Sequence, residues 1–143
     1  MDVEYAFLAD AAQTSSDGKL YVLGGGVDRI LATKFPAVHP AMSLVLKMRL
    51  HPTECDREHT LELELSDPDG NPVGGKVSAK FEAERQSHGR PAFVQLVLNV
   101  MQARFDHAGD YAFQVVIDGQ HHKSVSLYLE EPAGVAAPDA DEQ

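Results

Sequence analysis

Hydrophobic and polar side chains alternate with a period of two along most of the chain, and no window carries the 3.6-residue stripe of an amphipathic helix. In residues 41–51, for example, Leu46, Met48 and Leu50 alternate with Lys47 and Arg49. Alternation of this kind predicts β-strands that turn one face toward the core. Further strands are expected over residues 3–12, 19–23, 61–65, 73–84, 92–104, 111–117 and 125–129.

Turn-forming residues separate these strands. Asp17-Gly18 and Asp118-Gly119 are short-range hairpin signals, because glycine adopts positive φ without a Cβ clash, and residues 67–72 are dense in Asp, Pro, Gly and Asn. About eight strands at this spacing predict an all-β, antiparallel β-sandwich, immunoglobulin-like or a related Greek key, or else a closed barrel. We favour the sandwich, because outward Glu and Lys on the middle strands would give each sheet one solvated face.

The domain boundaries follow from length and composition. A chain of 143 residues is expected to form one domain, and the strands place it at residues 1–131. The remaining residues, 132–143, read PAGVAAPDADEQ and contain too little apolar surface to order themselves. We therefore expect a disordered acidic tail after the sandwich.

The segment 92–104 differs from the other strands because both of its faces are apolar. Phe93, Val97 and Met101 share the face opposite Val94 and Leu98. Two explanations stay open. Such a strand fits the interface of a homo-oligomer, and it equally fits a central strand covered by a loop or by the N-terminal hairpin.

Two local patterns refine the fold. The three glycines 24–26 lack the G-x-G-x-x-G spacing of a dinucleotide site, so a bulge or sharp bend is expected there. The stretch from Gly109 to Phe113 resembles the tyrosine corner of immunoglobulin-like sandwiches, with Tyr111 as its tyrosine. Phe113 stands where antibody domains have cysteine, and the chain has no tryptophan.

Charge and cysteine content limit the function classes. The net charge of −10 argues against nucleic-acid binding, and no apolar run reaches the ~20 residues of a membrane span. The N-terminal residues lack the basic and apolar regions of a signal peptide, and the single thiol, Cys55, forms no internal disulfide. The expected location is therefore cytoplasmic, with no membrane partner.

Catalytic and metal-binding patterns are weak. The seven histidines show no two-residue spacing on one strand, and Cys55 has acidic neighbours that disfavour a thiolate. Asp67-x-Asp69-x-Asn71 resembles a calcium loop, but Pro72 stands where the EF-hand needs glycine. We expect no cofactor and no resident metal.

Several segments resemble a family of small bacterial all-β proteins of unknown function. They are the acidic and aromatic N-terminus leading into Leu8-Ala9-Asp10-Ala11-Ala12, the stretch from Asp17 to Gly26, and Gly109-x-Tyr111-x-Phe113. The resemblance spans most of the chain. It implies a compact bacterial domain with no assigned activity and no catalytic residues to carry over.

The function most consistent with these patterns is a non-enzymatic binding or assembly module. Its partner would be another protein or a second copy of the chain, bound by β-strand addition or through loops. The most cationic loop supplies the candidate contact residues, Arg85, His88 and Arg90. The alternative is a metal-dependent enzyme in which scattered His and Asp side chains converge in space, and three histidines around one point would support it.

Overall fold

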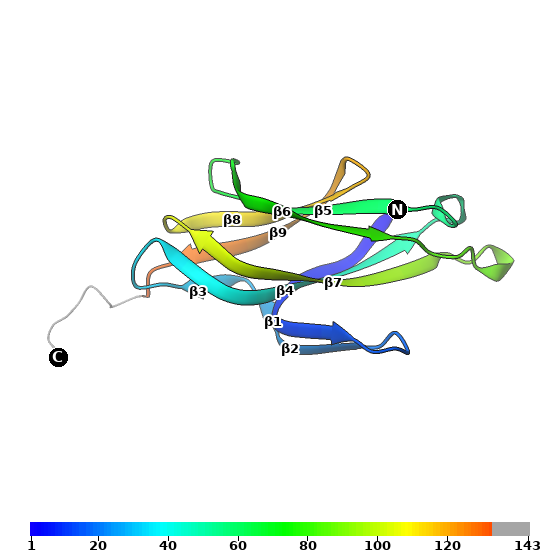
Figure 1. Ribbon diagram of the computed structural model, residues 1–143, viewed down its shortest axis with the longest axis horizontal. Helices are drawn as coiled ribbons and strands as arrows, with labels where there is room; N and C mark the ends of the chain where they lie inside the picture. Colours follow the sequence, from blue (N-terminus) through cyan, green and yellow to red (C-terminus); the bar gives the residue numbers. More distant parts are fainter. Residues whose placement is uncertain (133–143) are drawn as a thin grey trace, which may run out of the picture.

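Two β-sheets packed face to face form the molecule, and the computed structural model describes residues 1–132 (Figure 1). Sheet A has the strand order β2-β1-β4-β7, and sheet B has the order β3-β9-β8-β5-β6. The nine strands are β1 (Asp2–Thr14), β2 (Leu20–Val27), β3 (Arg29–Leu31), β4 (Ala37–Leu50), β5 (His59–Ser66), β6 (Pro72–Phe81), β7 (Ala92–Phe105), β8 (Gly109–Ile117) and β9 (Gln120–Glu130). Two short 3₁₀ turns, Pro52–Glu54 and Ser87–Gly89, follow β4 and precede β7.

The strand order is that of an immunoglobulin-like sandwich. Strands β1, β4 and β7 correspond to A, B and E, and β9, β8, β5 and β6 correspond to G, F, C and C′. Tyr111 stands near the start of β8, and its hydroxyl donates to the carbonyl of His107 at 2.9 Å. This is the predicted tyrosine corner. The all-β sandwich is confirmed, and one pair departs from the antiparallel prediction, because β3 runs parallel to β9.

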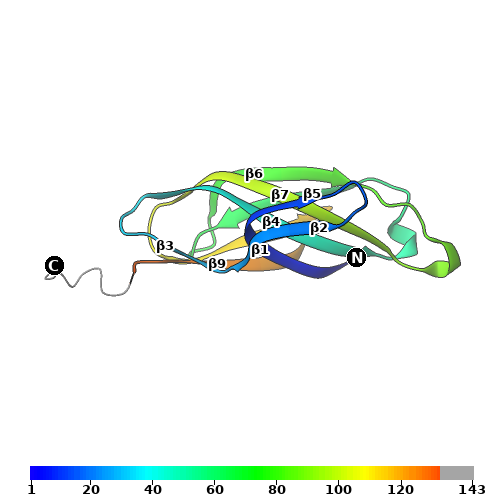
Figure 2. The ribbon, with the colours of Figure 1, turned by 90° about the horizontal axis from the view of Figure 1, so that it is seen from below.

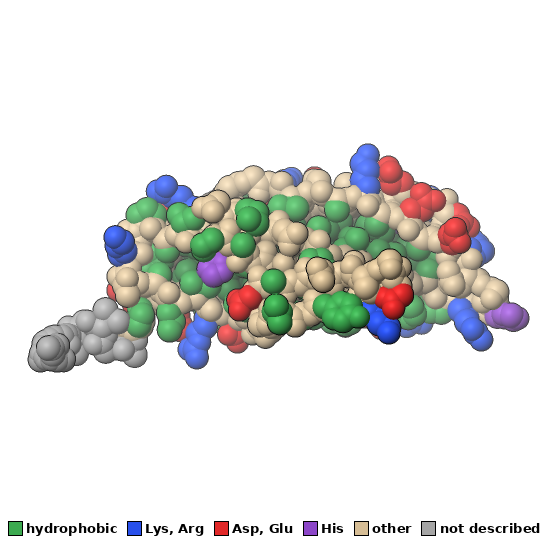
Figure 3. All heavy atoms as spheres, turned by 60° about the horizontal axis from the view of Figure 1, so that its bottom comes forward, with side chains coloured by type: hydrophobic (Ala, Val, Ile, Leu, Met, Phe, Trp, Pro, Cys, Tyr) green, Lys and Arg blue, Asp and Glu red, His purple; other side chains and the backbone are tan. Residues whose placement is uncertain are grey.

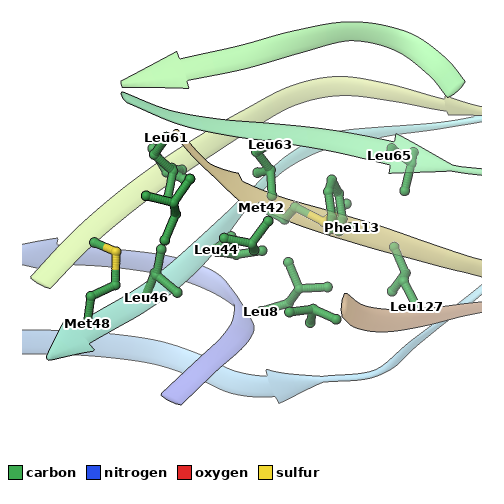
Figure 4. Close-up of a cluster of buried hydrophobic side chains, with 14 of the residues drawn as sticks. Leu8, Met42, Leu44, Leu46, Met48, Leu61, Leu63, Leu65, Phe113 and Leu127 are labelled. Atoms are coloured by element: carbon green, nitrogen blue, oxygen red, sulfur yellow. The ribbon is translucent and has the colours of Figure 1, made fainter. Parts of the chain in front are cut away.

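The core lies between the two sheets and is built from the inward positions of the alternating strands. Leu44, Leu46 and Met48 of β4 face Leu61 and Leu63 of β5, and all five side chains are buried (Figure 4). Phe105, at the end of β7, packs edge-on against Tyr111 near the start of β8, with ring centroids 5.0 Å apart. The period-two pattern therefore identified the core positions of the central strands.

Sheet B exposes a polar outer face. On this face the amide of Gln114 donates to the hydroxyl of Ser66 at 3.0 Å, and Ser124 donates to Gln114 at 2.6 Å. Lys76 lies 4.0 Å from Glu62 on the same side. The prediction of one solvated face holds for this sheet.

The outer face of sheet A is covered by the N-terminal hairpin, which we define as residues 9–27. After pairing with β4, strand β1 leaves the sheet plane, and its second half returns with β2 beneath β4 and β7 (Figures 1 and 2). Ser43 and Val45 point to this outer side yet are 3% and 0% exposed. The prediction of a solvated face is wrong for sheet A, because the hairpin excludes water from its centre.

The glycines of β2 allow this change of direction. The β1–β2 register pairs Leu8 with Val27 and Ala9 with Gly25, so Gly26 is left as the extra residue of a bulge. Gly24 and Gly26 both adopt positive φ, +64° and +80°. The predicted bulge at the three glycines is confirmed.

Two expectations concern the ends and the membrane. Apart from Pro132, the predicted acidic tail at 132–143 lies outside the described residues. Within the described part of the chain there is no helix of the length and apolarity that crossing a bilayer would need.

Candidate functional site

Four strands form the lateral edges of the two sheets, and three of them carry features that discourage pairing with another chain. β3 is only three residues long, and β2 is interrupted by its three glycines. β6 begins at Pro72, contains Gly74 and Gly75, and carries Lys76 and Lys80. Short length, proline, bulges and lysine are the usual ways in which edge strands avoid adding further strands.

The fourth edge, that of β7, has none of these features over residues 92–101, and Gln102 near its end adopts a positive φ of 54°. Its residues 92–103 include no charged side chain and no proline, and the strand is 14 residues long. β7 pairs with β4 alone. Among residues 1–132, no hydrogen bond from any segment other than β4 reaches its backbone. The β7 edge is therefore a long, uncharged row of backbone donors and acceptors without a partner strand in the described chain.

Apolar side chains accompany this edge on the outer face of sheet A. Phe93 is 50% exposed and Met101 is 64% exposed, with Val97 half-buried between them. The Lys47 ammonium lies 4.9 Å from the centre of the Phe93 ring. Figure 3, which views this side, shows hydrophobic side chains at the surface over the hairpin and the neighbouring strands.

The hairpin is anchored beside the edge through Gln95 of β7. The Gln95 side-chain amide donates to the carbonyl of Gly18 at 3.4 Å, and the Tyr5 hydroxyl donates to the Gln95 side-chain oxygen. Next along the same face, the Ser43 hydroxyl donates to Oδ1 of Asn99 at 2.9 Å. The hairpin thus covers the centre of sheet A and leaves the outermost positions of β7 accessible.

An open groove lies between β7 and β6, the two strands that end the sheets on this side. Its volume is about 450 Å³. Leu65, Val100 and Phe113 contribute apolar surface to it, and Gly74 and Gly75 form part of the opposite wall. The inward side chains Val94, Leu96 and Val100 of β7 are only partly buried, because sheet A has no strand beyond β7.

The predicted contact residues Arg85, His88 and Arg90 lie in the loop that leads into β7. All three are exposed, and their side chains form no hydrogen bond or ion pair within the described residues. The loop is held through its backbone, because the amide of Arg85 donates to Asp56 at 3.1 Å and that of Arg90 donates to Ser87 at 3.3 Å. The structure therefore places three unpaired cationic or titratable groups at the N-terminal end of the β7 edge.

One histidine lies in the core region. His59 begins β5 and is 1% exposed. Its Nε2 lies 2.7 Å from the carbonyl of Glu54 and its Nδ1 lies 2.6 Å from Oδ2 of Asp118. A carbonyl only accepts, so Nε2 carries a hydrogen that it donates to Glu54. His59 stands two residues before Leu61, on the inward side of the same alternation, and this spacing was the available signal for its burial.

Asp118 is held in its ionised form by these contacts. Burial raises the pKa of Asp118, but hydrogen bonds from His59 and from the Thr60 amide outweigh burial and lower that pKa below its ordinary value of 3.8. The Thr60 amide donates to Oδ1 at 2.9 Å. The carboxylate of Asp118 is therefore bound by both the His59 ring and the Thr60 amide.

The enzyme alternative required titratable side chains to converge. Cys55, His59 and Asp118 come from one region, but Nε2 of His59 donates to a carbonyl, and the Cys55 thiol lies 3.7 Å from the carbonyl of His51. A nucleophilic cysteine needs a base nitrogen that accepts its proton. Within residues 1–132, no three His, Cys, Asp or Glu side chains are grouped so that they would hold a metal ion.

Comparison with known proteins assigns the sandwich to a family. A family model described as "Family of unknown function (DUF6941)" matches residues 4–130. The chain belongs to this family. The DUF6941 match ends at the last residue of β9 and includes the N-terminal hairpin, the β7 edge and the 85–90 loop. The expected membership of a family of unknown function is confirmed, and no curated protein matches the chain.

Proposed function

We propose that this DUF6941 domain is a non-enzymatic binding module whose protein partner adds a β-strand to the β7 edge. The observation that carries the proposal is the contrast among the four sheet edges. Three are short, interrupted or charged, whereas residues 92–103 of β7 offer an uncharged strand with no partner beyond β4. An exposed strand of this kind associates with other chains unless a specific partner covers it.

The surroundings of β7 support strand addition as the binding mode. In that mode main-chain hydrogen bonds provide affinity, and alternate side chains of the added strand provide specificity. One set of side chains would enter the groove beside Val100 and Phe113, and the other set would lie next to Phe93 and Met101. Arg85, His88 and Arg90 would then contact the same partner at the end of the strand.

The chemical class of the partner follows from the charge. A net charge of −10 and an uncharged contact strand favour a protein partner over nucleic-acid phosphates. Both ring nitrogens of the buried His59 are occupied by Asp118 and Glu54, which supports a structural role for the pair.

A cytoplasmic location forms part of the proposal and rests on the single cysteine.

The test is site-specific photo-crosslinking in the native host. A benzoylphenylalanine at Phe93 should yield adducts with a defined segment of one protein, identified by mass spectrometry. The matched control is the same probe at Tyr21, which is 54% exposed against 50% for Phe93 and lies on β2, at the other end of the strand order of sheet A. Adding Met101→Lys to the Phe93 probe should lower the adduct yield several-fold, because a charge on an edge strand opposes pairing.

Two results would contradict the proposal. One is a yield at Phe93 no higher than at Tyr21. The other is a yield at Phe93 that is unchanged by Met101→Lys while the variant retains the wild-type unfolding midpoint.

A further inference from the structure

From the residues of β7 and its open edge, we infer that the strand added to this edge is β7 of a second copy of the chain. The two copies of β7 pair antiparallel across a two-fold axis that passes beside Val97. This inference rests on the proposed function and specifies its partner. Sheet A of each copy then continues into the other, with β7 against β7 at the centre of an eight-stranded sheet.

The outer face of β7 is self-complementary in this register. With Val97 opposite its own copy, Phe93 faces Met101 of the second copy, and Gln95 faces Asn99 of the second copy. The Phe93–Met101 pair brings an aromatic ring against an apolar side chain, and the Gln95–Asn99 pair brings two amides together, at the short distances of cross-strand neighbours. Asn99 uses Oδ1 for the Ser43 hydroxyl, so its side-chain N–H groups are available to donate to Gln95 of the second copy.

The inner face matches as well. The same register sets Val94 opposite Val100 and Leu96 opposite Leu98, so that every inward pair is apolar. Val94 of the second copy would extend the inner face of sheet A into the groove lined by Val100 and Phe113. The half-buried side chains at the end of sheet A would gain the neighbours that they lack in the single chain.

The charges that flank β7 favour the antiparallel direction. Residues 85–91, before the strand, carry Arg85 and Arg90 and no acidic residue, whereas residues 106–110, after it, carry Asp106 and Asp110 and no Lys or Arg. Arg104 is already paired with Asp106 at 2.9 Å. In this register antiparallel pairing places Arg90 of one copy opposite the Arg104–Asp106 ion pair of the other at both ends, whereas parallel pairing would place the two cationic 85–91 segments side by side.

The first test is the mass of the purified protein. Light scattering after size exclusion should give about twice the 15.6 kDa of one chain, falling on dilution to a single chain. Met101→Lys, which alters two Phe93–Met101 pairs in each dimer, should raise the dissociation constant roughly tenfold or more. Leu23→Lys is the matched control, because Leu23 is 74% exposed on the hairpin and should leave the dimer intact.

The second test fixes the register by disulfide crosslinking in a Cys55→Ala background. Paired strands hold opposite Cα atoms about 4.5 or 5.5 Å apart, within the range of a disulfide, so Val97→Cys should crosslink to its own copy on mild oxidation. Asn99→Cys is the control, because its Cα would lie about 13 Å from that of its copy. The double variant Gln95→Cys/Asn99→Cys should crosslink again.

The outcomes separate this inference from the proposed function. A single-chain mass at every concentration, or a Val97→Cys crosslink no faster than that of Asn99→Cys, overturns the second copy as partner. If the Phe93 probe then captures a different protein in a Met101-dependent way, strand addition at β7 stands with that protein as partner. If the Phe93 probe also gives no more than the Tyr21 control, both proposals fail.

Discussion

The imidazole of His59 lies 2.6 Å from the carboxylate of Asp118, and this contact joins the first residue of β5 to the turn between β8 and β9. The His59 ring also stacks on Phe81 of β6 with centroids 5.4 Å apart, and its second nitrogen reaches the carbonyl of Glu54. One buried side chain thus links three neighbouring parts of sheet B with the 3₁₀ turn that follows β4.

Asp118→Asn should destabilise the fold by about 2 kcal/mol, because it removes the carboxylate to which the buried His59 ring and the Thr60 amide are hydrogen-bonded. Removing one partner from a fully buried pair would cost more than this. The Asp118 side chain is 44% exposed, and this exposure reduces the loss of stability. Urea unfolding measures the change. Asp110→Asn, at an exposed position of β8, is the matched control and should lie within about 0.5 kcal/mol of wild type. Equal midpoints for the two variants would contradict the role given to the pair.

The same pair predicts an acid dependence. Since the pKa of Asp118 is lowered in the folded state, its contribution to the free energy of unfolding is present above the unfolded pKa near 3.8 and is lost as pH falls through the folded pKa. The stability difference between wild type and Asp118→Asn should therefore be present at about pH 5 and shrink below about pH 4. Urea midpoints across this range check it. A stability difference that grows as pH falls would contradict a lowered pKa of Asp118 in the folded state.

Tyr111→Phe should cost about 1 kcal/mol, because the buried hydroxyl donates to the His107 carbonyl at 2.9 Å and the variant leaves that carbonyl without its donor. Burial also raises the pKa of the Tyr111 phenol, so the hydroxyl keeps its proton throughout the neutral range. Tyr128→Phe is the control, since its ring is 39% exposed and its hydroxyl makes no hydrogen bond within residues 1–132. Thermal unfolding compares the two. A smaller loss for Tyr111→Phe than for Tyr128→Phe would refute the tyrosine corner as a stabilising contact.

Gly24→Ala should be more destabilising than Gly26→Ala. Both positions have positive φ, which costs an alanine about 1 kcal/mol. At Gly24 the new Cβ would in addition meet the Asp10 carboxyl group, with Cγ 2.7 Å away, whereas nothing lies within 4 Å at Gly26. In chemical denaturation, the free energy of unfolding of Gly24→Ala should therefore be lower than that of Gly26→Ala by about 1 kcal/mol. An equal loss in both variants would mean that the side chain of Asp10 moves aside at no cost.

Sequence patterns predicted the sandwich well because strand faces are a local property. A side chain two residues along a strand returns to the same face, so Leu61, Leu63 and Leu65 identified the inward side of β5 without any knowledge of its neighbours. The same rule extends to His59, although a histidine in a polar neighbourhood suggests a solvated side chain. Its burial depends on Asp118, which lies 59 residues away in the chain.

The apolar outer face of β7 shows where such prediction stops. Alternation established that Phe93, Val97 and Met101 share a face, and it left open whether a partner or the N-terminal hairpin covers that face. In the structure the hairpin covers only part of that face. The hairpin reaches Gln95 through Gly18, and Phe93 and Met101 stay exposed at its margins.

The sequence by itself determined the β-strands, the turns between them, the bulge at the glycines and the tyrosine corner, because each depends on residues close together in the chain. Only the tertiary structure decided which strands form the sheet edges, that β3 joins β9 in parallel, and that the hairpin folds over sheet A. These features depend on contacts between distant segments, whose pairing is set by the burial of whole faces rather than by any single residue. The uncharged stretch 92–103 was visible in the sequence, and its place at an open edge was not.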